Sequence, residues 1–158
     1  MTFKSRKVLS IAAAAGKIGM VYLIDGELMD WELSSCAALS TDQTARKAAK
    51  WIEFYRPDQV VIEKITPHSR KSTHTHALIS AIGEVANTYS TKLVAVERVP
   101  THANKFEEIK ELCIQFPQIA HHAPKKPEIW MPEPKATIYF EALSMAVQLG
   151  IAPPNLPQ

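Results

Sequence analysis

Two glutamates end short apolar runs of this sequence, where a carboxylate can do chemistry. Glu63 closes the run 59–63, and Glu97 closes the run 92–97. Carboxylate oxygens are ligands that hard cations such as Mg²⁺ prefer, and ligands of α/β sheets gather at the carboxyl ends of parallel strands. If both runs are parallel strands, the two side chains can approach one cleft. The alternative is that each of them faces solvent at the end of its strand.

A cluster of basic residues follows Glu63 directly. It contains Arg70 and Lys71 together with three histidines. Cationic side chains at the rim of a cleft can neutralise phosphates and hold a duplex without reading its sequence. The same residues also suit an ordinary solvated loop, and the pair His74 and His76 lacks a third partner at the spacing of a zinc site. The histidines of the cluster are His68, His74 and His76.

A second basic segment lies further along the chain. It holds His121, His122, Lys125 and Lys126, and Trp130 follows it. The Trp130 ring can stack on an exposed nucleobase, or it can cover core residues as a lid. The sequence leaves both interpretations open.

The composition predicts one globular domain over residues 1–150 and a loose, proline-containing tail over 151–158. Apolar residues make up 46% of the chain and charged residues 22%, which is enough apolar surface to close a core. The longest apolar stretch is shorter than the roughly 20 residues of a membrane-spanning helix, so we expect no membrane segment. The formal net charge of +2 does not by itself indicate a nucleic-acid partner.

The N-terminal segment allows two interpretations. Lys4, Arg6 and Lys7 precede a short apolar run with small residues, which is the pattern of a secretory signal peptide. A second apolar segment at 18–24 fits as the hairpin partner of the first. We therefore expect an intact N-terminal strand in a cytoplasmic protein.

Three strands are predicted at the start of the chain. The runs 8–14 and 20–24 are separated by glycines and indicate two strands with a tight connection. Asp25 and Gly26 form a dipeptide preferred in two-residue hairpin turns, where both positions favour positive φ, and a third strand follows at 27–33. Consecutive strands joined by short turns form an antiparallel meander.

Helices alternate with strands over the remainder of the domain. Ser40 or Thr41 offers an N-cap, and apolar residues at spacings of three and four predict a helix over 42–55. In the second helix we expect Ala77, Leu78, Ala81, Ile82 and Val85 to face inward. The further predicted elements are strands at 59–63 and 92–97 and helices at 74–89, 104–116 and 136–149.

This order gives an α/β fold with a five-stranded mixed sheet, in which three antiparallel meander strands precede two parallel strands and helices cover both faces. It is the order of a ribonuclease H-like domain, and the sequence resembles the RuvC Holliday-junction resolvase branch of that superfamily. The resemblance lies in the first strand and turn, the fourth strand with its catalytic glutamate, a glycine-bearing helix and the closing helix. The corresponding stretches are 8–19, 57–63, 80–83 and 140–146.

The resemblance implies a two-metal nuclease site of four acidic residues, where one Mg²⁺ or Mn²⁺ ion activates water and the other stabilises the leaving oxygen. It assigns Glu63 and Glu141 to that site as catalytic residues and metal ligands, and Glu97 can replace a missing ligand. Two positions depart from the pattern, because Ala12 stands at the first acidic position and Ile138 stands one turn before Glu141. The remaining carboxylates suit one weakly bound ion or none.

Three hypotheses follow from these residues. The leading hypothesis is a protein that recognises branched or double-stranded DNA by shape and backbone, with metal-dependent cleavage lost or reduced; RNA is a further candidate partner. The second is an active Mg²⁺- or Mn²⁺-dependent, structure-selective endonuclease built from Glu63, Glu97 and Glu141. The third is a non-catalytic structural or protein-interaction module. The resemblance also implies a homodimer, and the residues assigned to nucleic-acid contacts are His68, Arg70, Lys71, Lys125 and Lys126.

Overall fold

One five-stranded mixed sheet organises the protein in the computed structural model, which describes residues 6–99, 104–125, 130–131 and 133–151. The strand order is β3-β2-β1-β4-β5. The first three strands pair antiparallel, whereas β4 and β5 run parallel to β1. The predicted fold class is therefore confirmed. The strands are β1 (Lys7–Ala14), β2 (Lys17–Ile24), β3 (Glu27–Ser34), β4 (Gln59–Glu63) and β5 (Lys92–Val96).

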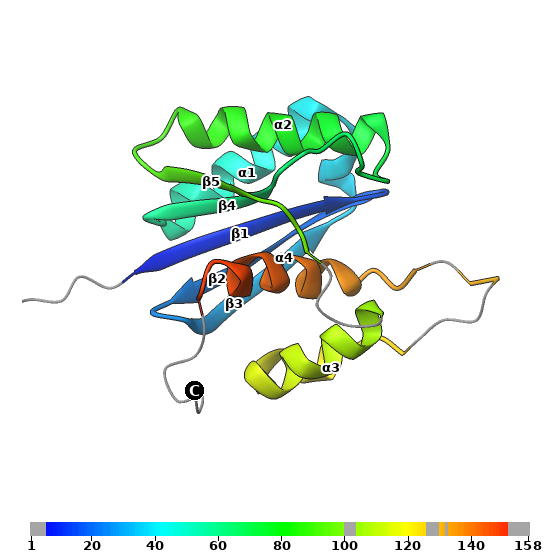
Figure 1. The fold of residues 1–158 in the computed structure, drawn as a ribbon. Helices are drawn as coiled ribbons and strands as arrows, with labels where there is room; N and C mark the ends of the chain where they lie inside the picture. The colour runs from blue at the N-terminus through cyan, green and yellow to red at the C-terminus, as the bar shows by residue number, and fades with distance from the viewer. Residues whose placement is uncertain (1–5, 100–103, 126–129, 132, 152–158) are drawn as a thin grey trace, which may run out of the picture.

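Helices cover both faces of this sheet (Figure 1). On one face lie α1 (Thr41–Tyr55) and α2 (Thr73–Asn87), and on the other lies α4 (Thr137–Gln148), with α3 (Lys105–Gln115) packed outside it. Two short 3-10 helices, η1 (Cys36–Leu39) and η2 (Pro117–His122), connect these elements. Within the described ranges, no helix combines the length and the apolar character that a membrane crossing requires.

The segment that resembles a signal peptide forms β1, a central strand of the sheet. Its hairpin partner β2 ends in the turn that the sequence predicts, because Asp25 and Gly26 have φ values of 51° and 83°. The amide of Arg6 donates to the Asp25 Oδ1 atom at 2.7 Å and fixes this turn against the start of β1. Positive φ at both positions matches the right-handed twist of the paired strands.

The inner face of α2 differs from the sequence prediction. Leu78 and Ile82 are buried as expected, but Ala77, Ala81 and Val85 are half-buried, and their place is taken by Ile79, Gly83 and Ala86. The reason is that α2 packs against α1 as well as against the sheet, which rotates its buried side toward the neighbouring helix.

Side chains of β1 alternate between two hydrophobic cores. Leu9, Ile11 and Ala13 pack toward α1 and α2, whereas Val8 and Ala12 pack toward α4. The strand therefore presents every second residue to the α4 face, which is also the face that carries the candidate site.

α4 approaches the sheet closely at Gly19 on β2. Gly19 pairs with Ala12 across the β1–β2 hairpin, and Ile138 lies above them with 1% of its surface exposed. A Cβ atom added at Gly19 would lie 2.7 Å from the Cγ2 atom of Ile138. The glycine thus makes the room that the isoleucine side chain fills.

This packing predicts a coupling between positions 19 and 138. Gly19→Ala should lower the free energy of unfolding by about 1–3 kcal/mol through overpacking. Ile138→Ala should lower it by about 2–5 kcal/mol through the cavity that it leaves. In the double variant the methyl group at position 19 lies in the space that the Ile138 side chain has left. Gly19→Ala should therefore lower the free energy of unfolding little further. Urea unfolding of the four proteins measures this, and strictly additive costs would contradict the packing described.

Candidate functional site

Glu63 and Glu141 converge on the α4 face of the sheet. Glu63 ends β4 with 8% of its surface exposed, and the Glu141 side chain on α4 is 11% exposed. Ser10 of β1 pairs with Val61 of β4, so two residues further along Ala12 comes beside Glu63. The methyl group of Ala12, rather than a carboxylate, therefore lies beside Glu63.

A buried hydrogen bond sets the position of α4 over β1. The Ser10 hydroxyl, fully buried, donates to the carbonyl oxygen of Ala142 at 2.7 Å. Ala142 directly follows Glu141, so this contact fixes the helix at the point where the glutamate faces the sheet.

The ammonium group of Lys71 lies between the two carboxylates. Its Nζ atom is 3.3 Å from the Glu63 Oε1 atom, and it also pairs with the Glu141 Oε1 atom. It also donates a hydrogen bond to the carbonyl oxygen of Ala13 at 2.7 Å. The Lys71 side chain is 20% exposed. The sequence predicts that Lys71 lies at the rim of the cleft. In the structure, Lys71 lies instead between the carboxylates of Glu63 and Glu141.

The loop between β4 and α2 holds Lys71 in this place. Ser72 caps α2, because its side chain accepts a hydrogen bond from the amide of Thr75. The loop is closed further by His76, whose Nε2 atom lies 2.9 Å from the Ser69 hydroxyl, and by the Ser69 amide, which donates to the carbonyl of Thr66. Lys71 therefore precedes the first turn of a capped helix and has a fixed backbone position.

Arg98 and Glu108 extend the charged cluster toward α3. The guanidinium of Arg98 lies 3.6 Å from the Glu141 carboxylate and 3.7 Å from that of Glu108. Among the residues that the structure describes, the buried Nε atom of Arg98 has no hydrogen-bond partner. Neither Arg98 nor Glu108 is predicted as a site residue from the sequence. Arg98 follows a predicted strand end, which is a weak signal, whereas nothing singles out Glu108 among the acidic residues of α3.

Glu97 does not join the cluster. The strand β5 ends at Val96, one residue earlier than predicted, and Val96 is the residue that faces the core beneath α4. Neighbouring residues of an extended chain point to opposite sides, and Glu97 is exposed. Its carbonyl oxygen accepts a hydrogen bond from Gln148 at 2.8 Å, so only its main chain contacts α4.

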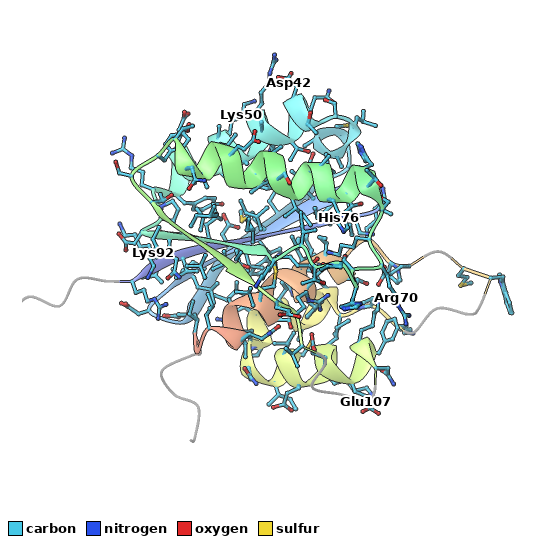
Figure 2. All side chains as sticks on the ribbon, turned by 45° about the horizontal axis from the view of Figure 1, so that its top comes forward. Asp42, Lys50, Arg70, His76, Lys92 and Glu107 are labelled. Carbon is cyan, nitrogen blue, oxygen red and sulfur yellow. The ribbon has the colours of Figure 1, made fainter. Side chains whose placement is uncertain are left out.

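The other basic residues of the first cluster are arranged around this site. His68 and Arg70 are exposed on the loop between β4 and α2, and Figure 2 labels Arg70 there. His74 is also exposed, and its Nε2 atom lies 2.9 Å from the carbonyl oxygen of Ala38. His68 and Arg70 are therefore accessible to a ligand, whereas the Lys71 side chain is only 20% exposed.

The second basic segment contributes less positive charge than its sequence indicates. Burial, together with the neighbouring His121 ring, lowers the pKa of His122 below its ordinary value. Lys125 is exposed, and Lys126 lies outside the described residues. Trp130 is 79% exposed, so it does not act as a lid over the core.

The arrangement does not fit a pair of hard divalent cations. Ala12 and Ile138 are apolar and buried where the resemblance requires carboxylates. Among the residues that the structure describes, no group of three or more histidine, cysteine, aspartate or glutamate side chains is placed to hold a metal ion. One oxygen each of Glu63 and Glu141, Oε1 in both, is in contact with Lys71.

No protein-family model and no curated protein matches the sequence. Solved structures match the fold. RuvC of Thermus thermophilus aligns with a TM-score of 0.59 and 15% identity over 92% of this chain and 98% of that one. The chain has the RuvC-like ribonuclease H fold.

Two further resolvases show the same fold. The fowlpox virus Holliday junction resolvase aligns with a TM-score of 0.58 and 17% identity, covering 90% of this chain and 97% of that one. The yeast mitochondrial Holliday junction resolvase aligns with a TM-score of 0.62 and 10% identity, covering 91% and 78%. The resemblance seen in the sequence is therefore confirmed at the level of the RuvC-like fold.

The hydrogen bond between Ser10 and Ala142 should contribute measurably to the stability with which α4 is held against β1. Ser10→Ala removes a buried donor to Ala142 and should lower the free energy of unfolding by about 1–3 kcal/mol. Ser80→Ala on the exposed side of α2 is the matched control and should stay within about 0.5 kcal/mol of the wild type. Chemical denaturation compares the two, and equal effects would show that the buried bond does not anchor α4.

Proposed function

We propose that this protein binds branched or double-stranded DNA by shape and backbone and does not cleave it. The observation that carries the proposal is a RuvC-like scaffold whose two remaining site carboxylates are paired with the chain's own cations, Lys71 and Arg98. RuvC of Thermus thermophilus and the fowlpox virus resolvase both match this fold in complex with Holliday junction DNA. A four-way junction is therefore the first ligand to test.

The charge balance supports binding without a metal ion. Bare carboxylates in a cleft repel the phosphates of DNA, and this repulsion is strong where water is excluded. Here Lys71 contacts both Glu63 and Glu141, and Arg98 contacts Glu141 as well. The DNA backbone can approach such a site without a divalent cation to screen it.

Exposed cations beside the site supply the contacts to phosphate. Arg70 and His68 lie on the loop that also carries Lys71, and Lys125 lies beyond η2. Phosphate contacts of this kind position a duplex and carry no sequence information. The proposal also includes Lys126 as a phosphate contact and a homodimer, both of which are predictions from the sequence. RNA remains a candidate ligand because its backbone carries the same phosphates.

One observation favours an active endonuclease as the second candidate. Glu108 of α3 shares Arg98 with Glu141, which brings a further carboxylate close to Glu141. An enzyme built on these residues needs Lys71 and Arg98 to leave the carboxylates before an ion can bind. A cleavage assay distinguishes this candidate from the first.

Binding should depend on salt and on the loop cations. Affinity for a four-way junction, measured by fluorescence anisotropy, should fall steeply as salt rises. Arg70→Ala with Lys125→Ala should reduce the slope of log K against log salt by about 1–2, since each lost phosphate contact contributes about 0.9. Lys50→Ala on the exposed side of α1, labelled in Figure 2, is the control and should bind like the wild type. Equal binding by both variants would contradict the assigned surface.

Cleavage should be absent under conditions that support metal-dependent nucleases. A four-way junction incubated with the protein and millimolar Mn²⁺ should stay intact on a denaturing gel. Cleavage that disappears in Glu63→Gln would contradict the proposal and establish the endonuclease. If no nucleic acid binds in a salt-dependent way, the protein is instead a structural or protein-interaction module.

A further inference from the structure

We propose that the Lys71 ammonium takes the place of a metal ion in this site and excludes divalent metal ions, and that its removal converts the site into one that binds them. The inference concerns the chain's own charges and goes beyond the proposed DNA binding. It does not require DNA to bind, so each of the two can fail without the other.

The atoms around Lys71 are those that a hard cation takes. They are one carboxylate oxygen each from Glu63 and Glu141 and the carbonyl oxygen of Ala13. These oxygens come from β4, α4 and β1, so the fold itself assembles them. Mg²⁺ and Mn²⁺ bind such oxygens. Here they surround an ammonium group, which donates to the Glu141 and Ala13 oxygens and forms an ion pair with Glu63. The lysine is therefore in contact with the same atoms that would otherwise bind an ion.

Burial makes a cation at this place necessary. The side chains of Glu63 and Glu141 are 10% and 11% exposed, so water screens their mutual repulsion poorly. Arg98 contacts Glu141 and Glu108, at 3.6 and 3.7 Å, and no contact of it with Glu63 is seen. Among the described residues, Lys71 is the cation within ion-pair distance of Glu63. Without Lys71, an external cation is the partner that the two carboxylates can share.

An external ion competes poorly with a lysine that the backbone holds in place. The Ser72 cap and the contact of His76 with Ser69 hold the loop of Lys71, and with it the backbone from which the ammonium reaches its acceptors. Ala12 and Ile138, both buried, offer no further oxygen ligands to an ion. Both features favour the lysine over a hydrated ion.

Thermal unfolding with and without metal tests the proposal. The Tm of the wild type should be the same in EDTA and in 5–10 mM MnCl₂, roughly within 1 °C, because no site is open to the ion. Lys71→Met keeps most of the aliphatic chain and should lower Tm in EDTA by roughly 5–15 °C, as expected for an unpaired buried charge. Mn²⁺ should then restore several degrees of that loss. Lys64→Met, at an exposed position of the same loop, is the matched control and should behave like the wild type.

A double variant separates the effect of the unpaired charge from the effect of the lost lysine packing. Lys71→Met with Glu141→Gln removes the cation and one of its carboxylate partners together. Its Tm in EDTA should lie above that of Lys71→Met alone, and its response to Mn²⁺ should be lost. If Lys71→Met refolds only in Mn²⁺ and not in EDTA, that result supports the proposal equally.

Three outcomes would overturn the proposal. One is a wild-type protein that Mn²⁺ stabilises as much as it stabilises Lys71→Met. Another is a Lys71→Met variant that folds without responding to Mn²⁺. The third is a variant that stays unfolded with and without the ion while the variant carrying Glu141→Gln in addition folds no better. Junction binding is measured separately, so its absence would refute the proposed function and leave this inference intact.

Discussion

Two carboxylates buried side by side cannot both stay charged without a cation between them, and this constraint governs the candidate site. Glu63 at the end of β4 and Glu141 on α4 meet this condition by sharing the ammonium of Lys71. The cost of leaving buried charges unpaired is several kcal/mol, which is comparable to the whole stability of a domain. The position of the loop between β4 and α2 is therefore part of the chemistry of the site and not only a connection between two elements.

The apolar half of the site is consistent with this charge balance. Ala12 and Ile138 replace oxygen ligands by methyl groups, and Gly19 makes room for Ile138 against the sheet. A site with fewer carboxylates has less negative charge to neutralise, so one lysine with help from Arg98 suffices. The same residues that make a two-metal site unsuitable are thus compatible with a site that needs no metal ion.

Local patterns were sufficient to predict most of the fold. The turn at Asp25 and Gly26, the cap at Ser40 and the alternation of strands and helices depend on neighbours within a few residues. The site depends on contacts that no local pattern reports. Lys71 pairs with Glu141 seventy positions away, and its direction is set by the hydrogen bonds of its loop. Glu97 lies away from Glu63 because its neighbour Val96 is the residue that pairs with Glu63 and packs beneath α4, and successive side chains of an extended segment point to opposite sides.

The most direct test of the account is a crystal soaked in MnCl₂, with anomalous difference density measured around Glu63 and Glu141. The account predicts no manganese peak between the two carboxylates, with the Lys71 ammonium in contact with both. Manganese bound by Glu63 and Glu141, with Lys71 displaced toward solvent, would contradict it and favour a metal-dependent enzyme.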